Sequence, residues 1–476
     1  MKLSITLLFL FFIFSISHSY SQESENKVWT LQDCIEYAWD NNLVIKQQEL
    51  GVGLAEQNLL QSRGNLFPTL NANASHGYNY GRTVDPFTNE FATESVQTNN
   101  FSISSGLTLF SGLQILNSIR QSKLELEASK YDVESVRNDI ALAIASAYLQ
   151  ILYSIEMVEV NESQLEITKQ QIERTKKLVE SGAQPKGTLF NIEAQLASEE
   201  LQLINAKNRL DLAYLDLIQL LDIKEADSFE ISIPEVEITD EDKLEYTPLE
   251  MYSVAVSIQP EIKSSDIKVE SAKKGLSIAK GGRSPMLSLR GAYGSGYSGA
   301  SREVTEVIMG EPTEIGVTAT GVSVYAPSFE YETRIKPFND QLEDNLNRNF
   351  GLYLTIPIFN NFQVSSSVAK SKINVDNAKI TSQRTRDQLF KTIQQAHADA
   401  SAALKRFHAS EVNVKALQES FRYIEQRFNV GMVNHFEYND AKNRLVAAES
   451  EMLQSKYEYI FRIRILDFYI GNPIEL

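Results

Sequence analysis

The chain is poor in cysteine, glycine and proline, and it carries no excess of positive charge. Its 476 residues include one cysteine, Cys34, together with 22 glycines and 12 prolines. A single cysteine excludes an intrachain disulfide and a cysteine-based metal cluster. Few glycines and prolines fit long uninterrupted elements better than a loop-rich fold. The 45 basic and 62 acidic side chains give a net charge of −17, which disfavours binding to nucleic acid because phosphate backbones attract clustered cations.

Motifs that would indicate an enzyme are also missing. The sequence contains no glycine-rich phosphate loop followed by Lys and Ser or Thr, and no G-x-S-x-G nucleophile motif. The histidines are scattered, and no pair has the spacing of metal ligands on one helix. We therefore predict no enzymatic activity, no cofactor and no metal site, and keep a secreted enzyme on a helical scaffold only as an alternative.

Long apolar runs are confined to the N-terminus. Lys2 precedes the apolar stretch 3–16, and Ser19 and Ser21 provide a small-x-small cleavage site. This pattern is typical of a signal peptide over residues 1–21, with an N-terminal membrane anchor as the alternative. No later run approaches the roughly 20 apolar residues of a membrane-spanning helix, so none is predicted. The shorter strands of a membrane barrel are not excluded by that absence.

The two halves of the chain repeat each other. An offset of 217 aligns the first parts of the two halves, pairing Thr30 with Thr247, Ala38 with Ala255 and Pro68 with Pro285. An offset of 249 aligns the remainder, pairing Lys123 with Lys372 and Gly182 with Gly431. The second half therefore has 32 additional residues, which fall between Pro285 and Phe359. A repeat of this length indicates a duplicated domain rather than a short solenoid unit.

Each half is predicted as helix, strand, loop, strand, very long helix, break and helix. The first helix opens with a capping-box pattern at Thr30 or Thr247 and ends near Gly64 or Gly281. The first repeat, 22–226, has predicted strands at 69–80 and 99–110, a long helix at 112–181 and a helix at 188–221. An acidic linker, 227–246, precedes the second repeat, 247–476, with strands at 286–297 and 349–359, a long helix at 361–430 and a helix at 436–470.

The two long helices carry apolar residues every seven positions. The first series is Ile144, Ile151, Val158, Leu165, Ile172 and Val179, and the second, 249 residues later, is Ile393, Ala400, Phe407, Val414, Phe421 and Phe428. A strict seven-residue period keeps one seam of a helix against a partner helix and favours left-handed coiling. We predict coiled-coil hairpins with tips at 182–187 and 431–436; an ordinary amphipathic helix is the alternative.

The four predicted strands alternate apolar with small or polar residues, and each is about ten residues long. That length spans a bilayer as a tilted strand, although two soluble hairpins with one solvent-exposed face would give the same pattern. Four strands cannot close a barrel, so a membrane barrel would need several copies of the chain. The predicted lipid-facing residues are Phe101, Ile103, Leu107, Leu109, Phe350, Leu352, Leu354, Ile356 and Ile358.

In its order of elements the sequence resembles the TolC family of outer-membrane efflux channels. The resemblance covers essentially the whole mature chain and rests on four segments: the opening 30–38, the Leu-Phe-Pro-Thr-Leu of 66–70, the Gly-Leu-Thr-Leu-Phe-Ser-Gly of 106–112 and the Arg-Phe-Asn-Val-Gly of 427–431. It implies a mainly α fold with a small β part, in which long helical hairpins form a periplasmic α-barrel. It also implies a homotrimer in outer-membrane lipid, with four strands per chain in a shared twelve-stranded barrel.

The resemblance further implies partners and sites. The expected function is the exit channel of a tripartite efflux or type I secretion system, docked to a periplasmic adaptor and an inner-membrane transporter of the RND or ABC type. The expected docking residues are Gly182, Val430, Gly431 and Met432. Glu437 and Asp440, three apart on one helix face, are expected to line a periplasmic constriction, although a solvated helix face is the alternative. A periplasmic coiled-coil adaptor or structural protein without a membrane barrel is the alternative function.

Overall fold

The structure, a computed structural model, describes residues 28–92, 95–224, 229–234, 238 and 246–474. The predicted signal peptide, 1–21, lies outside these residues. The chain divides into two compact units, which are described separately. Unit 1 comprises the described residues of Met1–Val52, Ala128–Asp266 and Thr381–Leu476, and unit 2 those of Gly53–Glu127 and Ile267–Ile380.

Each repeat begins with two helices rather than the predicted one. These are α2 (Leu31–Asn41) and α3 (Leu43–Gly64) in the first repeat, and α6 (Pro248–Ile258) and α7 (Pro260–Gly281) in the second. Both predicted capping boxes are present, because Thr30 exchanges hydrogen bonds with Asp33 and Thr247 exchanges them with Glu250. The prediction of one continuous helix was wrong because Asn42 and Gln259 adopt extended backbone conformations between the paired helices.

Local chemistry explains both breaks. The Asn42 side chain accepts a 2.8 Å hydrogen bond from the amide of Val44 and so caps α3, while Pro260 restricts Gln259 to an extended conformation. Each side-chain amide also donates to the backbone carbonyl near the end of the returning helix, Asn42 to Leu220 and Gln259 to Tyr469. These two bonds are related by the offsets of 217 and 249, so the duplication extends to individual hydrogen bonds.

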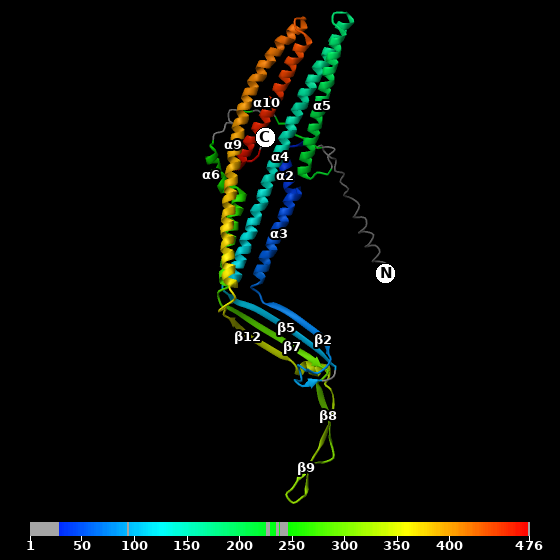
Figure 1. Ribbon diagram of the computed structural model, residues 1–476, viewed down its shortest axis with the longest axis vertical. Coiled ribbons are helices and arrows are strands. Elements are labelled where there is room, and N and C mark those ends of the chain that lie inside the picture. The colour runs from blue at the N-terminus through cyan, green and yellow to red at the C-terminus, as the bar shows by residue number, and fades with distance from the viewer. Residues whose placement is uncertain (1–27, 93–94, 225–228, 235–237, 239–245, 475–476) are drawn as a thin grey trace, which may run out of the picture. The chain divides into compact units, whose positions relative to one another are not determined.

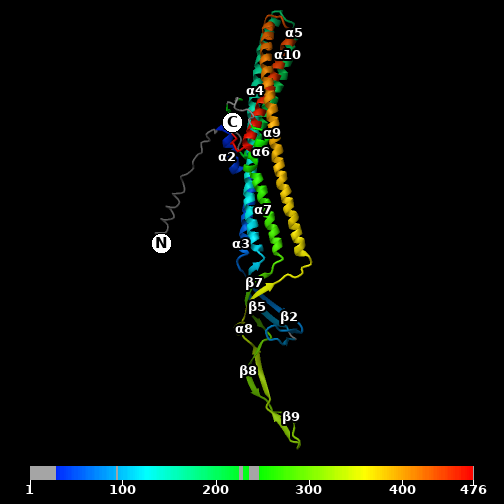
Figure 2. The ribbon, with the colours of Figure 1, turned by 90° about the vertical axis from the view of Figure 1, so that its left-hand side faces the viewer.

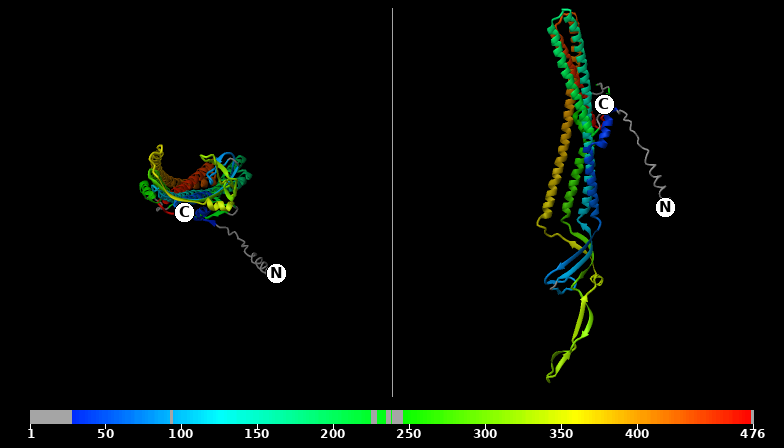
Figure 3. Two further views of the ribbon diagram at one scale, coloured as in Figure 1. Left: turned by 90° about the horizontal axis from the view of Figure 1, so that it is seen from below. Right: turned by 90° about the vertical axis from the view of Figure 1, so that its right-hand side faces the viewer.

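The long helices form hairpins with the helices that follow them. Helix α4 (Gln114–Glu180) is followed by α5 (Lys186–Leu221), and α9 (Gln363–Asn429) by α10 (His435–Tyr469). Within unit 1, Figure 1 shows α4 beside α5 and α9 beside α10, and Figure 2 and Figure 3 show the same hairpins from other sides. All twelve predicted heptad positions are buried or half-buried, as expected for a seam that faces partner helices.

Two hydrophobic cores stabilise unit 1. The first gathers residues of α2, α4, α5 and α10 around the fully buried Tyr148, Ile144 and Ile151. The second gathers residues of α6, α9 and α10, including Ala255, Ile393 and Tyr459. The hydroxyl of Tyr148 donates a hydrogen bond to the backbone carbonyl of Ser232, with 2.5 Å between the two oxygens. Each repeat thus packs its capped first helix against its own long helix.

Helix α4 contains the one stretch, among the described residues, that is long and apolar enough to cross a membrane. The sequence analysis overlooked it, because serines, tyrosines, Gln150 and Glu156 interrupt the aliphatic residues between Ile140 and Val158. About 44% of the window is already buried inside the protein. Since Ile144, Tyr148 and Ile151 lie in this stretch, its apolar character is accounted for by the first core.

Unit 2 contains an antiparallel four-stranded sheet, shown in Figure 1. Its strands are β2 (Thr69–Asn79), β5 (Val96–Ser111), β7 (Met286–Ser298) and β12 (Asn347–Thr355), in the order β12-β7-β5-β2. The central pair β5–β7 joins the hairpin of the first repeat to that of the second. Prolines precede β2 and β7 closely, which is consistent with a residue that cannot donate to a strand ladder.

The segment 298–348, which is the predicted loop between the strands 286–297 and 349–359, is largely ordered into strands. Strand β8 (Arg302–Met309) pairs with β11 (Phe329–Ile335), and β9 (Thr313–Val317) pairs with β10 (Ser323–Ala326). Helix α8 (Phe338–Asp344) follows them. The prediction was wrong because alternating valine, isoleucine and tyrosine residues compensate for the many glutamates and glycines.

Two short strand pairs complete the fold. Strand β1 (Val28–Trp29) pairs in parallel with β6 (Glu230–Ile231), so part of the predicted acidic linker, 227–246, joins a small sheet. Of that linker the structure describes 229–234, 238 and 246. Strands β3 (Thr83–Val84) and β4 (Phe91–Ala92) form a small hairpin in the segment between β2 and β5.

Candidate functional site

One face of the four-stranded sheet is predominantly apolar across all four strands, interrupted by Ser105 and, nearer the loop end, by His76, Asn99, Ser295 and Arg348. Paired residues in an antiparallel sheet point to the same face, so the register identifies the members of each face. Leu352 is paired with Leu289, which is paired in turn with Leu107. The same face carries Leu70, Ala72, Ala74, Phe101, Ile103, Phe110, Leu287, Tyr293, Tyr297, Phe350 and Leu354. Most of its large side chains are exposed in the single chain.

The opposite face is polar. It carries Asn71, Asn73, Ser75, Ser102, Ser104, Thr108, Ser288, Arg290 and Asn349. The guanidinium of Arg290 lies 5.3 Å from the centre of the Tyr353 ring on this face. Segregation of apolar and polar side chains onto two faces matches a membrane strand with one side towards lipid and the other towards water.

Three of the predicted lipid-facing residues lie elsewhere than expected. A bulge at Leu109 interrupts the register between Thr108 and Phe110, so Phe110 takes the apolar-face position opposite Leu287. Ile356 and Ile358 are exposed but follow the end of β12 at Thr355. The prediction of a longer strand ignored Pro357, which has no backbone N–H for the ladder and restricts the residue before it.

Both edges of this sheet are open. Strands β2 and β12 each pair on one side only, and no other described strand completes them. In lipid an open edge leaves N–H and C=O groups without partners at a cost of several kcal/mol each. An apolar face of this kind therefore becomes stable in a membrane only when further strands close both edges.

The helical hairpins of unit 1 end in exposed turns. Gly182 and Gly431 have φ values of +76° and +77°, a left-handed conformation that favours glycine. Beside Gly431, Val430 and Met432 are 69% and 73% exposed. The four predicted docking residues thus lie at two tips, and the second tip presents apolar side chains to solvent.

Glu437 and Asp440 are both exposed on α10, Glu437 in the first turn and Asp440 in the second. The amide of Glu437 donates to Asn434 Oδ1 at 2.9 Å, and Asn434 Nδ2 donates to Glu437 Oε1 at 3.3 Å, so this glutamate takes part in the helix cap. Asp440 Oδ2 lies 2.9 Å from Arg444 Nε. The two predicted constriction carboxylates are therefore accompanied by one cation, which the sequence analysis did not include.

A buried ion pair joins the two hairpins. Lys442 of α10 and Glu199 of α5 have side chains that are 3% and 2% exposed, with 3.3 Å between Nζ and Oε1. Lys442 also donates to Thr168 Oγ1 at 2.5 Å and to the Gln164 carbonyl at 2.9 Å, and Thr168 donates to Glu199 at 2.5 Å. Burial lowers the pKa of Lys442, and the neighbouring Glu199 carboxylate opposes that change.

The sequence analysis missed this pair, although a signal was present. Glu199 occupies a buried heptad series of α5 with Ile192, Ala206 and Ala213, so a charge stands at a core position. At the offset of 249, its counterpart in the second repeat is Ala448. A polar residue at one core position of a coiled coil specifies register and partner.

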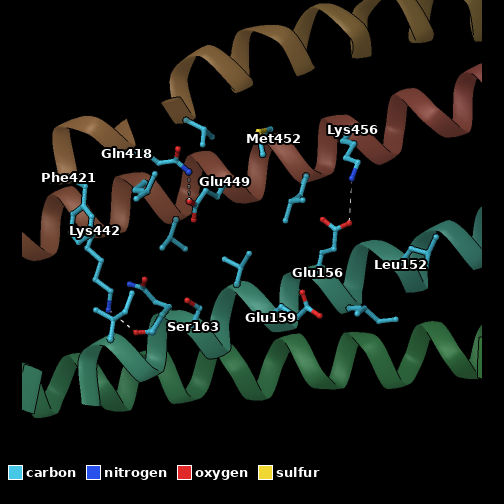
Figure 4. A pocket seen from close by; sticks show the side chains of 18 of the residues that line it. Leu152, Glu156, Glu159, Ser163, Gln418, Phe421, Lys442, Glu449, Met452 and Lys456 are labelled. Atoms are coloured by element: carbon cyan, nitrogen blue, oxygen red, sulfur yellow. Dashed lines mark hydrogen bonds and ion pairs between the residues drawn. The ribbon is translucent and has the colours of Figure 1, made fainter. Parts of the chain in front are cut away.

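An open groove lies between α4, α9 and α10, as shown in Figure 4. Its volume is about 830 Å³, and its charged lining residues include Glu156, Glu159, Glu449, Lys442 and Lys456. Lys456 Nζ lies 3.7 Å from Glu156 Oε1, and Gln418 donates to Glu449 at 3.4 Å. Lys456 and Glu156 pair with each other and Lys442 pairs with Glu199, and no nucleophile with an adjacent base lies among the lining residues.

No group of three His, Cys, Asp or Glu side chains is positioned to hold a metal ion within the described ranges. Cys34 is buried in α2.

Comparison with known proteins supports one family. A family model described as outer membrane efflux protein matches residues 34–222 and 251–472, one stretch in each repeat. The outer membrane efflux protein BepC of Brucella suis is 18% identical over 433 residues, covering 90% of this chain and 83% of BepC. The CmeC outer membrane channel of Campylobacter jejuni superimposes with a TM-score of 0.75 at 18% identity, covering 94% of this chain and 86% of CmeC. VceC, an outer membrane protein of Vibrio cholerae, superimposes with a TM-score of 0.73 at 15% identity, covering 94% of this chain and 97% of VceC.

Proposed function

Because the chain belongs to the outer membrane efflux protein family, whose members are outer-membrane channels and not enzymes, we propose that three copies form the exit duct of a tripartite export system. The family assignment places the protein in the outer membrane of a Gram-negative bacterium, with a periplasmic portion, and excludes the alternative of a periplasmic adaptor. The observation that carries the proposal is the four-stranded sheet, which has an apolar face and two open edges.

Three sheets placed edge to edge give twelve strands. Each β2 then pairs with the β12 of a neighbouring copy, which supplies partners for the groups at both edges. The apolar faces turn towards lipid, and the polar faces line an aqueous lumen. Transport is passive, with energy supplied by an inner-membrane transporter of the RND or ABC type through a periplasmic adaptor.

Reconstitution of the purified protein tests this function. We expect a trimer in detergent that inserts into planar bilayers and produces discrete conductance steps. A monomer that remains water-soluble and never inserts into liposomes would contradict the proposal.

We place a cation-selective constriction at Glu437 and Asp440. Three copies bring six carboxylates and three Arg444 side chains together, so each chain contributes a net charge of −1. Replacing Glu437 with Gln and Asp440 with Asn removes the carboxylates while keeping hydrogen-bond acceptors at the helix cap. This double variant is expected to conduct more and to lose most of its block by divalent cations, measured in planar bilayers.

Arg444→Gln is the matched variant. It removes the cation beside Asp440, so divalent block should become several-fold stronger. If neither variant changes the block, these residues do not line a constriction.

We place the adaptor contact at the tips, around Gly182 and Gly431. Gly431→Trp is expected to reduce export roughly tenfold, equivalent to about 1.4 kcal/mol of docking energy. Gly431→Asn is the control, because asparagine tolerates the left-handed conformation and adds little bulk. Dye accumulation in cells measures export, and native gels verify that both variants form trimers. Normal export by the Trp variant would argue against docking at this tip.

A further inference from the structure

Residues 302–335 form a two-stranded ribbon that extends beyond the sheet within unit 2 (Figure 1). The ribbon follows β7 at the loop end of the sheet, which faces the outside in the proposed function. The first repeat has no counterpart, because the 32 extra residues of the second repeat fall in this interval. The ribbon is therefore an addition to the duplicated fold rather than a part of it.

The base of the ribbon is firmly held. Gln341 of α8 accepts a hydrogen bond from the amide of Ser298 at 2.9 Å and donates to its carbonyl at 3.0 Å. The hydroxyl of Ser298 donates to the buried carboxylate of Asp85. Burial would raise the pKa of Asp85, but hydrogen bonds from Ser298, Thr88 and the Phe87 amide outweigh it, and the pKa is lowered. These contacts fix the direction in which the ribbon leaves the sheet.

The inner part of the ribbon, β8 and β11, has two chemically different faces. Met309 is paired with Phe329 and Val307 with Tyr331, and the same face carries Val304, Thr333 and Ile335, with Arg302 opposite Ile335 at the base of the ribbon. The opposite face carries Glu306 paired with Glu332, together with Glu303, Glu330, Ile308 and Arg334. We call these the apolar ribbon face and the acidic ribbon face.

Nothing in the described part of the single chain covers the apolar ribbon face. Met309 is 75% exposed, and Val304, Val307, Phe329, Tyr331 and Ile335 are also exposed. A two-stranded ribbon is only marginally stable in water by itself. Packing of this face against another apolar surface would therefore stabilise the ribbon.

The surface that covers the apolar ribbon face must also be compatible with the charge of residues 302–335. Residues 302–335 contain six glutamates and two arginines, a net charge of −4. Such a segment is repelled by phosphate-bearing lipid headgroups, so the membrane surface is disfavoured as the occupant. Identical ribbons carry the same charge, but no glutamate lies on the apolar ribbon face, so these faces can pack together while the acidic faces remain apart in solvent.

We propose that the apolar ribbon faces of three copies pack against one another above the outer mouth of the channel. The proposal rests on the trimer of the proposed function, because closing the sheet edges brings three ribbon bases into one ring. Eight residues of β8 reach roughly 27 Å, so neighbouring ribbons are long enough to meet. If the apolar ribbon faces turn towards the three-fold axis, the three Val307 side chains meet at that axis.

Cysteine cross-linking in intact cells tests the proposal. Val307→Cys lies on the apolar ribbon face, and Glu306→Cys, one residue earlier, lies on the acidic ribbon face. The native Cys34 is buried, so the introduced thiol is the accessible one. Mild oxidation should convert up to two of every three Val307→Cys chains into disulfide-linked dimers, while Glu306→Cys chains stay monomeric on denaturing gels.

A second pair of cysteine variants provides an independent test in case one variant of the first pair misfolds. Tyr331→Cys and Glu332→Cys occupy the same two faces on β11 and should behave like the first pair. Equal cross-linking from both faces, or none from the apolar face in a protein that forms trimers on native gels, would overturn the ribbon proposal alone. Absence of trimers and of bilayer conductance would instead overturn the proposed function.

Discussion

Replacing Lys442 with alanine is expected to destabilise the helical hairpins by about 3–5 kcal/mol. The substitution leaves Glu199, 2% exposed, without its cation in a buried site. Removing the buried Lys442 charge stabilises the folded state by less than leaving the Glu199 carboxylate buried and unpaired destabilises it. Thermal and urea unfolding of the detergent-solubilised protein, followed by circular dichroism, measure the change.

A double variant separates the charge effect from simple loss of volume. Lys442→Met with Glu199→Met removes both charges and should regain most of the stability, although the hairpins would lose a feature that specifies their register. Arg422→Ala, which breaks an exposed pair with Glu419, should change stability little. A Lys442→Ala protein that unfolds like the wild type would show that the pair does not contribute.

Ile103→Arg is expected to prevent insertion into the outer membrane. Ile103 lies near the middle of β5 on the apolar face, where an arginine facing lipid costs about 2–4 kcal/mol in each chain. In the proposed trimer, three chains share one barrel, which multiplies that cost. The amount of heat-modifiable trimer in outer-membrane fractions, and urea titration in liposomes, provide the measurements.

Ser104→Arg is the control for this prediction. It introduces the same side chain one residue later, at nearly the same depth but on the polar face. The lumen of a twelve-stranded barrel is aqueous, so this variant should insert and show an altered ion selectivity. Equal insertion of the two variants would mean that the assignment of the faces is wrong.

Much of the fold could be predicted because two periodicities are explicit in the sequence. The seven-residue series from Ile144 and from Ile393 identified both long helices and the faces they bury. Alternation by two identified the strands, and the duplication indicated that both halves contain the same succession of elements along the chain. These signals are local and redundant, since each is repeated many times or occurs in both halves of the chain.

The features that were missed depend on single residues or on distant contacts. The break at Asn42 is stabilised by the carbonyl of Leu220, which lies 178 positions away in the chain. The bulge at Leu109 exists only in relation to β7. Lys442 and Glu199 are 243 positions apart, so neither charge indicates its partner until the helices are placed.

The open edges at β2 and β12 have a consequence for biogenesis. A newly synthesised chain has unpaired backbone N–H and C=O groups along β2 and β12, and such exposed strand edges readily pair with unrelated chains. In the proposed trimer, closure of the sheet edges and association of the chains occur in the same step. The rate of trimer formation should therefore rise steeply with the local concentration of identical chains. Overproduction from a strong promoter would outpace that event, and slow expression should give the higher proportion of functional pores.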